Sequence, residues 1–174
     1  MPDGDLLARL RTATRPIHDR LDALAPFATP TRYAAFLHAM LAGHRPLIDA
    51  LGDGQRETVR RLEDDLAELG KSPQGVIDVP TAFASEGTPG VRYVVLGSRF
   101  GASAMLSGVR SSMPDAPTRF LAGGGDDAAS WRRFKAELDE VPPEASLACE
   151  RAAIATFGSF EAALRHHLEI GSVG

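Results

Sequence analysis

The stretch GVRYVVLGSRFGASAMLSGV, residues 90–109, decides the fold class of this chain. Its Tyr-Val-Val-Leu run would suit a short strand, because β-branched and aromatic residues favour strands. A single strand is not stable by itself, however, and no second strand is available to pair with it. The apolar pattern also continues through Phe100, Met105, Leu106 and Val109. We therefore predict a helix here.

The rest of the chain repeats the helical pattern. Apolar residues recur at helical spacing almost everywhere, while alternating β-branched runs are scarce, so we predict an all-α protein. Pro46 should bend or divide the second helix, since a proline inside a helix removes a backbone hydrogen bond. Gly70 is a natural end for the third. Besides residues 90–109, helices are expected over residues 5–24, from Thr29 or Thr31 onward, and over residues 57–69, 128–141 and 144–170.

Composition narrows the class of protein. With 174 residues, 44% of them hydrophobic, the chain should form one domain over residues 1–174 with an ordered core at about 5–170. The net charge of -4 and the dispersed Lys and Arg argue against a nucleic-acid or anionic-membrane partner. The single cysteine, Cys149, excludes an internal disulfide and any Cys-rich metal site. Without an apolar run of about 18 residues, the protein is expected to be soluble and cytoplasmic.

His18 is the first candidate for chemistry. On a helix that begins near residue 5, the apolar stripe spans roughly ±45° and His18 falls near 80°, at its rim. Arg11 falls near 100° on the same flank, with Thr14 slightly inside and Asp22 slightly outside. One interpretation is a half-exposed histidine bonded to Asp22 or Asp19, which is the common case. The other is an imidazole that lines a cleft beside a cationic residue.

Gly97-Ser98-Arg99-Phe100-Gly101 is the second candidate. Glycines four residues apart share one face of a helix, and each costs about 1 kcal/mol relative to alanine. Two of them indicate that something approaches the backbone closely. A neighbouring helix and a flat ligand both remain open.

Other groups of residues give weaker indications of chemistry than these two candidates. His38 and His44 face apart on one helix, and the adjacent His166 and His167 cannot readily share a helical metal site. The chain has neither a G-x-S-x-G nor a Walker motif, so hydrolase and NTPase functions have no support. Trp131-Arg132-Arg133 could supply guanidinium groups to carboxylates or could be solvated surface.

Five motifs follow one another along the chain, namely Leu10–His18, Tyr33–Leu37, Arg61–Gly70, Tyr93–Gly101 and Trp131–Leu138. The A-T-x-x-x-H helix is the most specific of them, and the Gly-Ser-x-x-Gly helix is the next. Together, over about residues 6–165, they resemble the heme oxygenase family, and most closely its bacterial, bacteriophytochrome-associated branch.

The resemblance implies a multi-helix fold with heme held between the first, proximal helix and a glycine-containing distal helix. It makes His18 the proximal ligand of the heme iron, with Thr14, Leu21 and Asp22 on the same side of the heme. A neutral imidazole can bind iron through one nitrogen while a carboxylate orients its other N–H, and Asp22, four residues on, suits that role.

The resemblance also assigns the other side of the heme. Gly97, Ser98 and Gly101 match the distal helix, where side chains would fill the space above the macrocycle. Arg11 matches a basic position that meets a heme propionate, and Arg132 is a candidate for the other propionate.

The implied activity is oxygen-dependent opening of heme to biliverdin, with release of carbon monoxide and iron. Electrons would come from a ferredoxin-type or reductase donor, and a bilin-binding photoreceptor is a further expected partner. Two positions depart from the bacterial pattern, because Leu96 replaces a glutamate and Ala102 replaces a second glycine. The alternatives are therefore a heme-binding or sensory protein of the same fold that has lost turnover, or a helical interaction module without heme.

Overall fold

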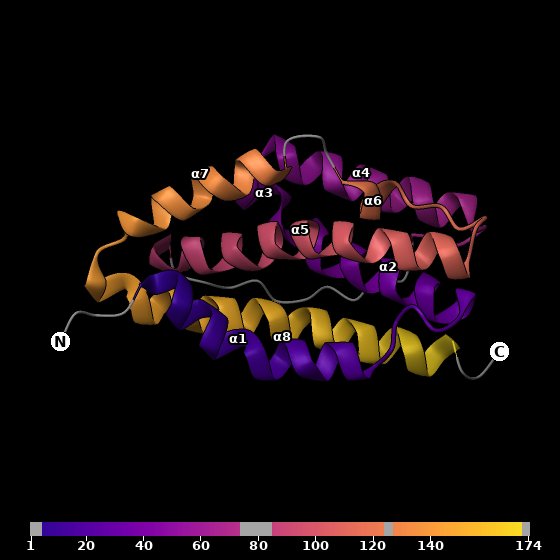
Figure 1. Cartoon of the computed structure of the whole chain (residues 1–174), viewed down its shortest axis with the longest axis horizontal. Coiled ribbons are helices and arrows are strands. Elements are labelled where there is room, and N and C mark those ends of the chain that lie inside the picture. The colour runs from indigo at the N-terminus through magenta and orange to yellow at the C-terminus, as the bar shows by residue number, and fades with distance from the viewer. Residues whose placement is uncertain (1–4, 74–84, 124–126, 172–174) are drawn as a thin grey trace.

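The computed structural model describes residues 5–73, 85–123 and 127–171, and within these ranges all regular structure is helical (Figure 1). The all-α prediction is confirmed. Residues 74–84 and 124–126, which fall inside the predicted core, lie outside the described residues. The elements in order are α1 (Leu6–Ala23), α2 (Pro30–His44), η1 (Arg45–Leu47), α3 (Ile48–Leu51), α4 (Asp53–Glu68), η2 (Ser85–Gly87), α5 (Thr88–Ser112), α6 (Arg119–Ala122), α7 (Asp127–Asp139), η3 (Pro143–Ala145) and α8 (Ser146–Gly171).

Local signals set the first helix boundaries. The Asp5 carboxylate accepts a hydrogen bond from the Leu7 amide and caps α1. Thr29 caps α2 in the same way, with a proline in the first turn. As predicted, Pro46 divides the next segment, since α2 ends at His44 and a 3₁₀ turn separates it from α3. α4 begins a turn earlier than predicted because Gly52, at φ +76°, allows the chain to reverse there.

α8 is the helix on which the others assemble. α1, α2 and α5 all pack against it, and α1 and α8 lie side by side along one face of the molecule (Figure 1). α7 packs on α5, while α6 touches α4 and α5. Side chains with almost no solvent exposure fill the space between these helices, among them Leu10, Leu37, Leu41, Leu62, Phe134 and Phe160.

The short helix α6, which the sequence did not predict, is held by a residue from another helix. The fully buried Asp65 of α4 accepts hydrogen bonds from the backbone N–H groups of Arg119, at 3.1 Å, and Phe120, at 2.9 Å. The Arg119 guanidinium donates to the same carboxylate at 3.1 Å. Asp65 therefore supplies the N-terminal partner that α6 lacks in its own sequence. Across the ranges that the structure describes, no helix has the length and apolar character to span a lipid bilayer.

Candidate functional site

A cavity of about 240 Å³ opens between α1, α5 and α8. Most of its wall is apolar or aromatic, which suits a large flat ligand. Six of the predicted site residues meet in it: His18, Leu21 and Asp22 from α1, and Gly97, Ser98 and Gly101 from α5. The remaining lining residues are Pro26, Phe27, Phe36, Met40, Tyr93, Val94, Ala102, Met105, Trp131, Phe157, Phe160 and Leu164.

The position of His18 agrees with both interpretations, because this histidine is half exposed beside Asp22 and also lines the cavity. Its side chain is 55% exposed, and its Nδ1 lies 3.2 Å from Oδ2 of Asp22. The ring edge also faces Phe157 of α8 at 6.3 Å between ring centres. When Nδ1 carries the proton donated to Asp22, Nε2 keeps its lone pair and is the nitrogen that can bind a metal. Asp22 therefore fixes both the tautomer and the direction of the ring.

The two predicted glycines of α5 are not explained by helix packing. A Cβ built on Gly97 or Gly101 would meet no described atom within 4 Å. Gly90, on the same helix, is different, because a Cβ there would lie 1.9 Å from the carbonyl oxygen of Cys149 in α8. Close approach of a neighbouring helix thus accounts for Gly90. The open space at Gly97 and Gly101 favours the other interpretation, a flat ligand against the backbone.

A buried histidine stands behind Ser98. His44 of α2 has no solvent exposure, and its Nε2 lies 3.4 Å from Ser98 Oγ. The Gln55 side-chain amide donates to His44 Nδ1 at 2.8 Å and to the His44 carbonyl oxygen at 2.7 Å. Since Nδ1 accepts, the proton is on Nε2, which can donate to the Ser98 hydroxyl. Ser98 in turn donates to the Val95 carbonyl at 2.8 Å.

Burial keeps this histidine neutral. Desolvation lowers the pKa of His44 from 6.5 to about 4, and the positive charge of Arg99 acts in the same direction. His44 was not predicted as a site residue, because the spacing of the helical histidines bears only on whether they could share a metal. One signal was present: His44 is a polar residue that closes a largely apolar helix.

Three of the predicted site residues do not line the cavity. Thr14 is buried, but its hydroxyl donates to the Leu10 carbonyl at 2.8 Å, one helical turn back. The prediction that Thr14 lines the ligand space is therefore not supported, because its hydroxyl is used within α1. Arg11 and Arg132 are exposed and lie outside the lining. Contact of either with a heme propionate remains a prediction.

The two departures from the family pattern fall on different faces of α5. Ala102 lines the cavity that His18 also lines. Leu96 does not, and its side chain instead forms part of a second cavity on another face of the helix. The loss of a carboxylate at Leu96 therefore changes the wall of that second cavity.

The side chains around the cavity could supply one ligand to a metal ion whose other ligands come from a bound group. Within the described ranges, no group of three or more His, Cys, Asp or Glu side chains is placed to hold a metal ion. A single imidazole beside an apolar cavity instead suits an iron already held by a macrocycle. The open space at Gly97 and Gly101 is where such a flat group would lie.

The arrangement of the helices is the heme oxygenase fold. The chain matches a crystal structure of the NO- and CO-bound heme oxygenase from Neisseria meningitidis with a TM-score of 0.78, over 95% of this chain and 93% of that one, at 23% sequence identity. A heme oxygenase from Xanthomonas campestris pv. campestris (strain 8004) is 29% identical over 112 residues, which are 59% of this chain and 67% of that protein. No protein-family model matches the sequence. The chain is therefore similar in sequence to one heme oxygenase and has the fold of another.

Proposed function

We propose that this chain is a heme oxygenase that binds heme in the cavity between α1 and α5 and converts it to biliverdin, carbon monoxide and iron. The observation that carries the proposal is the pair Gly97 and Gly101, which leave open space in a cavity that His18 also lines. The similarity to heme oxygenases in both sequence and fold supports the same function.

In this proposal each wall of the cavity has a separate task. His18 binds the heme iron through Nε2, and Asp22 holds the ring in position through Nδ1. Phe157 and Trp131 contribute apolar surface to the cavity and exclude water from it. Bound heme supplies the iron centre at which oxygen is reduced. Ser98, which can accept from His44 and donates to Val95, keeps a lone pair for a water molecule in the cavity.

We further propose the partners that this reaction requires. Molecular oxygen and an external electron donor of the ferredoxin or reductase type are needed, because the proposed opening of heme to biliverdin consumes both oxygen and electrons. Arg11 and Arg132 would meet the heme propionates, since a guanidinium pairs well with a carboxylate. Motif similarity to the bacteriophytochrome-associated branch supports a bilin-binding photoreceptor as recipient of the product, in the cytoplasm.

A hemin titration of the purified chain tests the proposal. We expect a Soret band at one hemin per chain, and loss or shift of that band in His18→Ala. His166→Ala is the matched control, because His166 lies on α8 outside the cavity, and it should bind hemin as the wild type does. Ascorbate and oxygen should then convert the complex to biliverdin.

The same titration separates the alternatives. A normal Soret band without biliverdin would select the heme-binding or sensory protein, an alternative that Ala102 favours because it narrows the cavity. Absence of stoichiometric hemin binding would contradict both functions and select a helical interaction module.

A further inference from the structure

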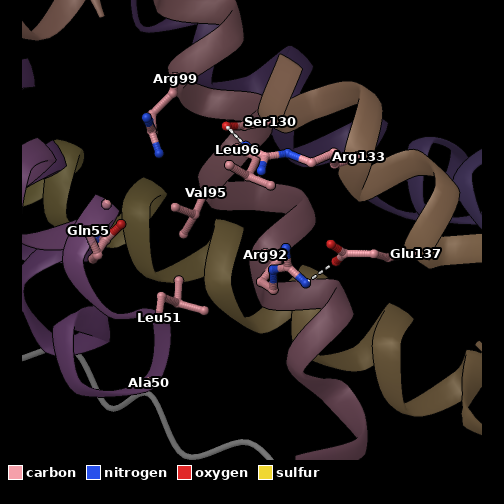
Figure 2. A pocket seen from close by; sticks show the side chains of 11 residues that line it. Ala50, Leu51, Gln55, Arg92, Val95, Leu96, Arg99, Ser130, Arg133 and Glu137 are labelled. Carbon is pink, nitrogen blue, oxygen red and sulfur yellow. Dashed lines mark hydrogen bonds and ion pairs between the residues drawn. The ribbon is translucent and has the colours of Figure 1, made fainter. Parts of the chain in front are cut away.

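A second, larger cavity of about 510 Å³ lies on another face of α5, between this helix, α4 and α7. Its described lining holds three arginines, namely Arg92, Arg99 and Arg133, and one acidic residue, Glu137. Arg92 is ion-paired with Glu137, Arg133 donates a hydrogen bond to Ser130 Oγ at 3.5 Å, and the Arg99 side chain extends from α5 toward α4 (Figure 2). Basic groups therefore outnumber acidic ones among the described lining residues, and the proposed heme chemistry does not use them.

A buried acceptor forms part of the same wall. Gln55 is only 2% exposed, and its NH₂ group is occupied by the two acceptors of His44, at 2.7 and 2.8 Å. Reversing the amide would set Oε1 against the His44 carbonyl oxygen, so the orientation is fixed. Oε1 then has no hydrogen-bond partner among the described residues. In Figure 2 this oxygen points toward the space below Arg99.

A buried carbonyl without a hydrogen-bond partner destabilises the fold, so a ligand that donates a hydrogen bond to it would relieve that cost. The neighbouring helix end adds attraction for negative charge. α4 has 16 residues, no described side chain caps its N-terminus, and Gly54 of its first turn lines the cavity. The partial positive charge of this helix end acts in the same direction as the arginines.

We propose that this cavity binds a hydrogen-phosphate group, either as free phosphate or in a small phosphate monoester whose sugar hydroxyl supplies the donor. The guanidinium groups and the start of α4 hold the negatively charged oxygens. The remaining O–H donates to Gln55 Oε1. Sulfate has similar shape and charge but has no proton to donate at neutral pH, so the site should distinguish the two anions.

Isothermal titration of the full chain without heme tests this site in a low-salt buffer free of phosphate. We expect inorganic phosphate to bind saturably at one site and sulfate to bind more weakly by roughly tenfold or more. The double variant Arg99→Gln/Arg133→Gln should lose roughly tenfold or more in phosphate affinity. Arg110→Gln is the matched control, since Arg110 is exposed on α5 outside the cavity, and it should bind phosphate as the wild type does.

Titration with ribose 5-phosphate shows whether the cavity prefers a phosphate monoester or free phosphate. Tighter binding than inorganic phosphate would support a phosphate monoester, and equal or weaker binding would support free phosphate. Thermal unfolding of each variant verifies its fold, and Arg133→Gln alone replaces the double variant if the latter unfolds early.

Three results would overturn the proposal: no saturable binding up to about 10 mM phosphate, equal affinity for sulfate, or an equal loss of affinity in Arg110→Gln. None of these results depends on hemin, so failure of this site and failure of the heme oxygenase function are distinguishable.

Discussion

Replacing Gly97 by alanine should stabilise the heme-free protein and weaken heme binding at the same time. Alanine inside a helix is favoured over glycine by about 0.5–1 kcal/mol. Nothing in the structure opposes this gain, because a Cβ on Gly97 would meet no described atom within 4 Å. For a chain of this length the gain corresponds to an increase in Tm of about 1–4 °C.

The same methyl group would project into the space proposed for heme. Forcing an extra carbon into a closely packed space costs about 1–3 kcal/mol, which corresponds to a roughly 5- to 150-fold lower hemin affinity. Gly108→Ala is the matched control, because Gly108 is also on α5 with nothing within 4 Å of its Cβ, but lies outside the cavity. It should raise Tm similarly and leave hemin affinity unchanged.

Thermal unfolding of the heme-free proteins and hemin titration followed by absorbance measure the two effects separately. A lower Tm of the heme-free Gly97→Ala protein would contradict the open space at Gly97. Equal hemin affinities of Gly97→Ala and Gly108→Ala would show that Gly97 does not face the heme.

Further expected outcomes concern the stability of the fold, measured by urea unfolding. His44 is neutral in the folded protein, so its contribution to stability is retained above pH 6.5 and falls by about 3 kcal/mol toward pH 4; His44→Gln should remove this contribution and leave the separate decrease due to His167, whose pKa burial also lowers to about 4, and an unchanged pH profile would refute the assignment. Gly90→Ala should destabilise the protein by about 1–3 kcal/mol or more, because its Cβ would lie 1.9 Å from the Cys149 carbonyl oxygen; a wild-type midpoint would contradict this contact. Asp65→Ala should cost about 3–5 kcal/mol, because it leaves buried donors at the start of α6 unpaired, and a loss below about 1 kcal/mol would show that α6 does not need that carboxylate.

The helices were predictable where their signals are local. The helix that became α5 followed from the lack of any partner strand for residues 93–96, and the position of Pro46 predicted the break after α2. The four-residue helix α6 was not predictable in this way. It depends on Asp65, more than fifty residues away in the sequence, and no local pattern records such a contact.

In the candidate site, too, features set within one helix were predictable and contacts between helices were not. The helical angle of His18 correctly placed it at the rim of the buried face, because that angle depends only on α1. The family resemblance also placed Thr14 beside the heme, but its hydroxyl group donates to the Leu10 carbonyl of its own helix. The contact between His44 and Ser98 joins α2 to α5, so it could be found only after the two helices were placed together.

The glycines of α5 divide this helix into two mechanically different parts. At Gly90 the backbone of α5 lies so close to the backbone of α8 that a Cβ would not fit between them. From Gly97 onward, a Cβ on the glycines would meet no described atom within 4 Å. The N-terminal end is therefore the more closely packed part, and we expect ligand entry to displace the segment beyond Gly97. Hydrogen exchange should accordingly be slow near Gly90, faster from Gly97 to Gly108, and slower in that second segment after hemin is added.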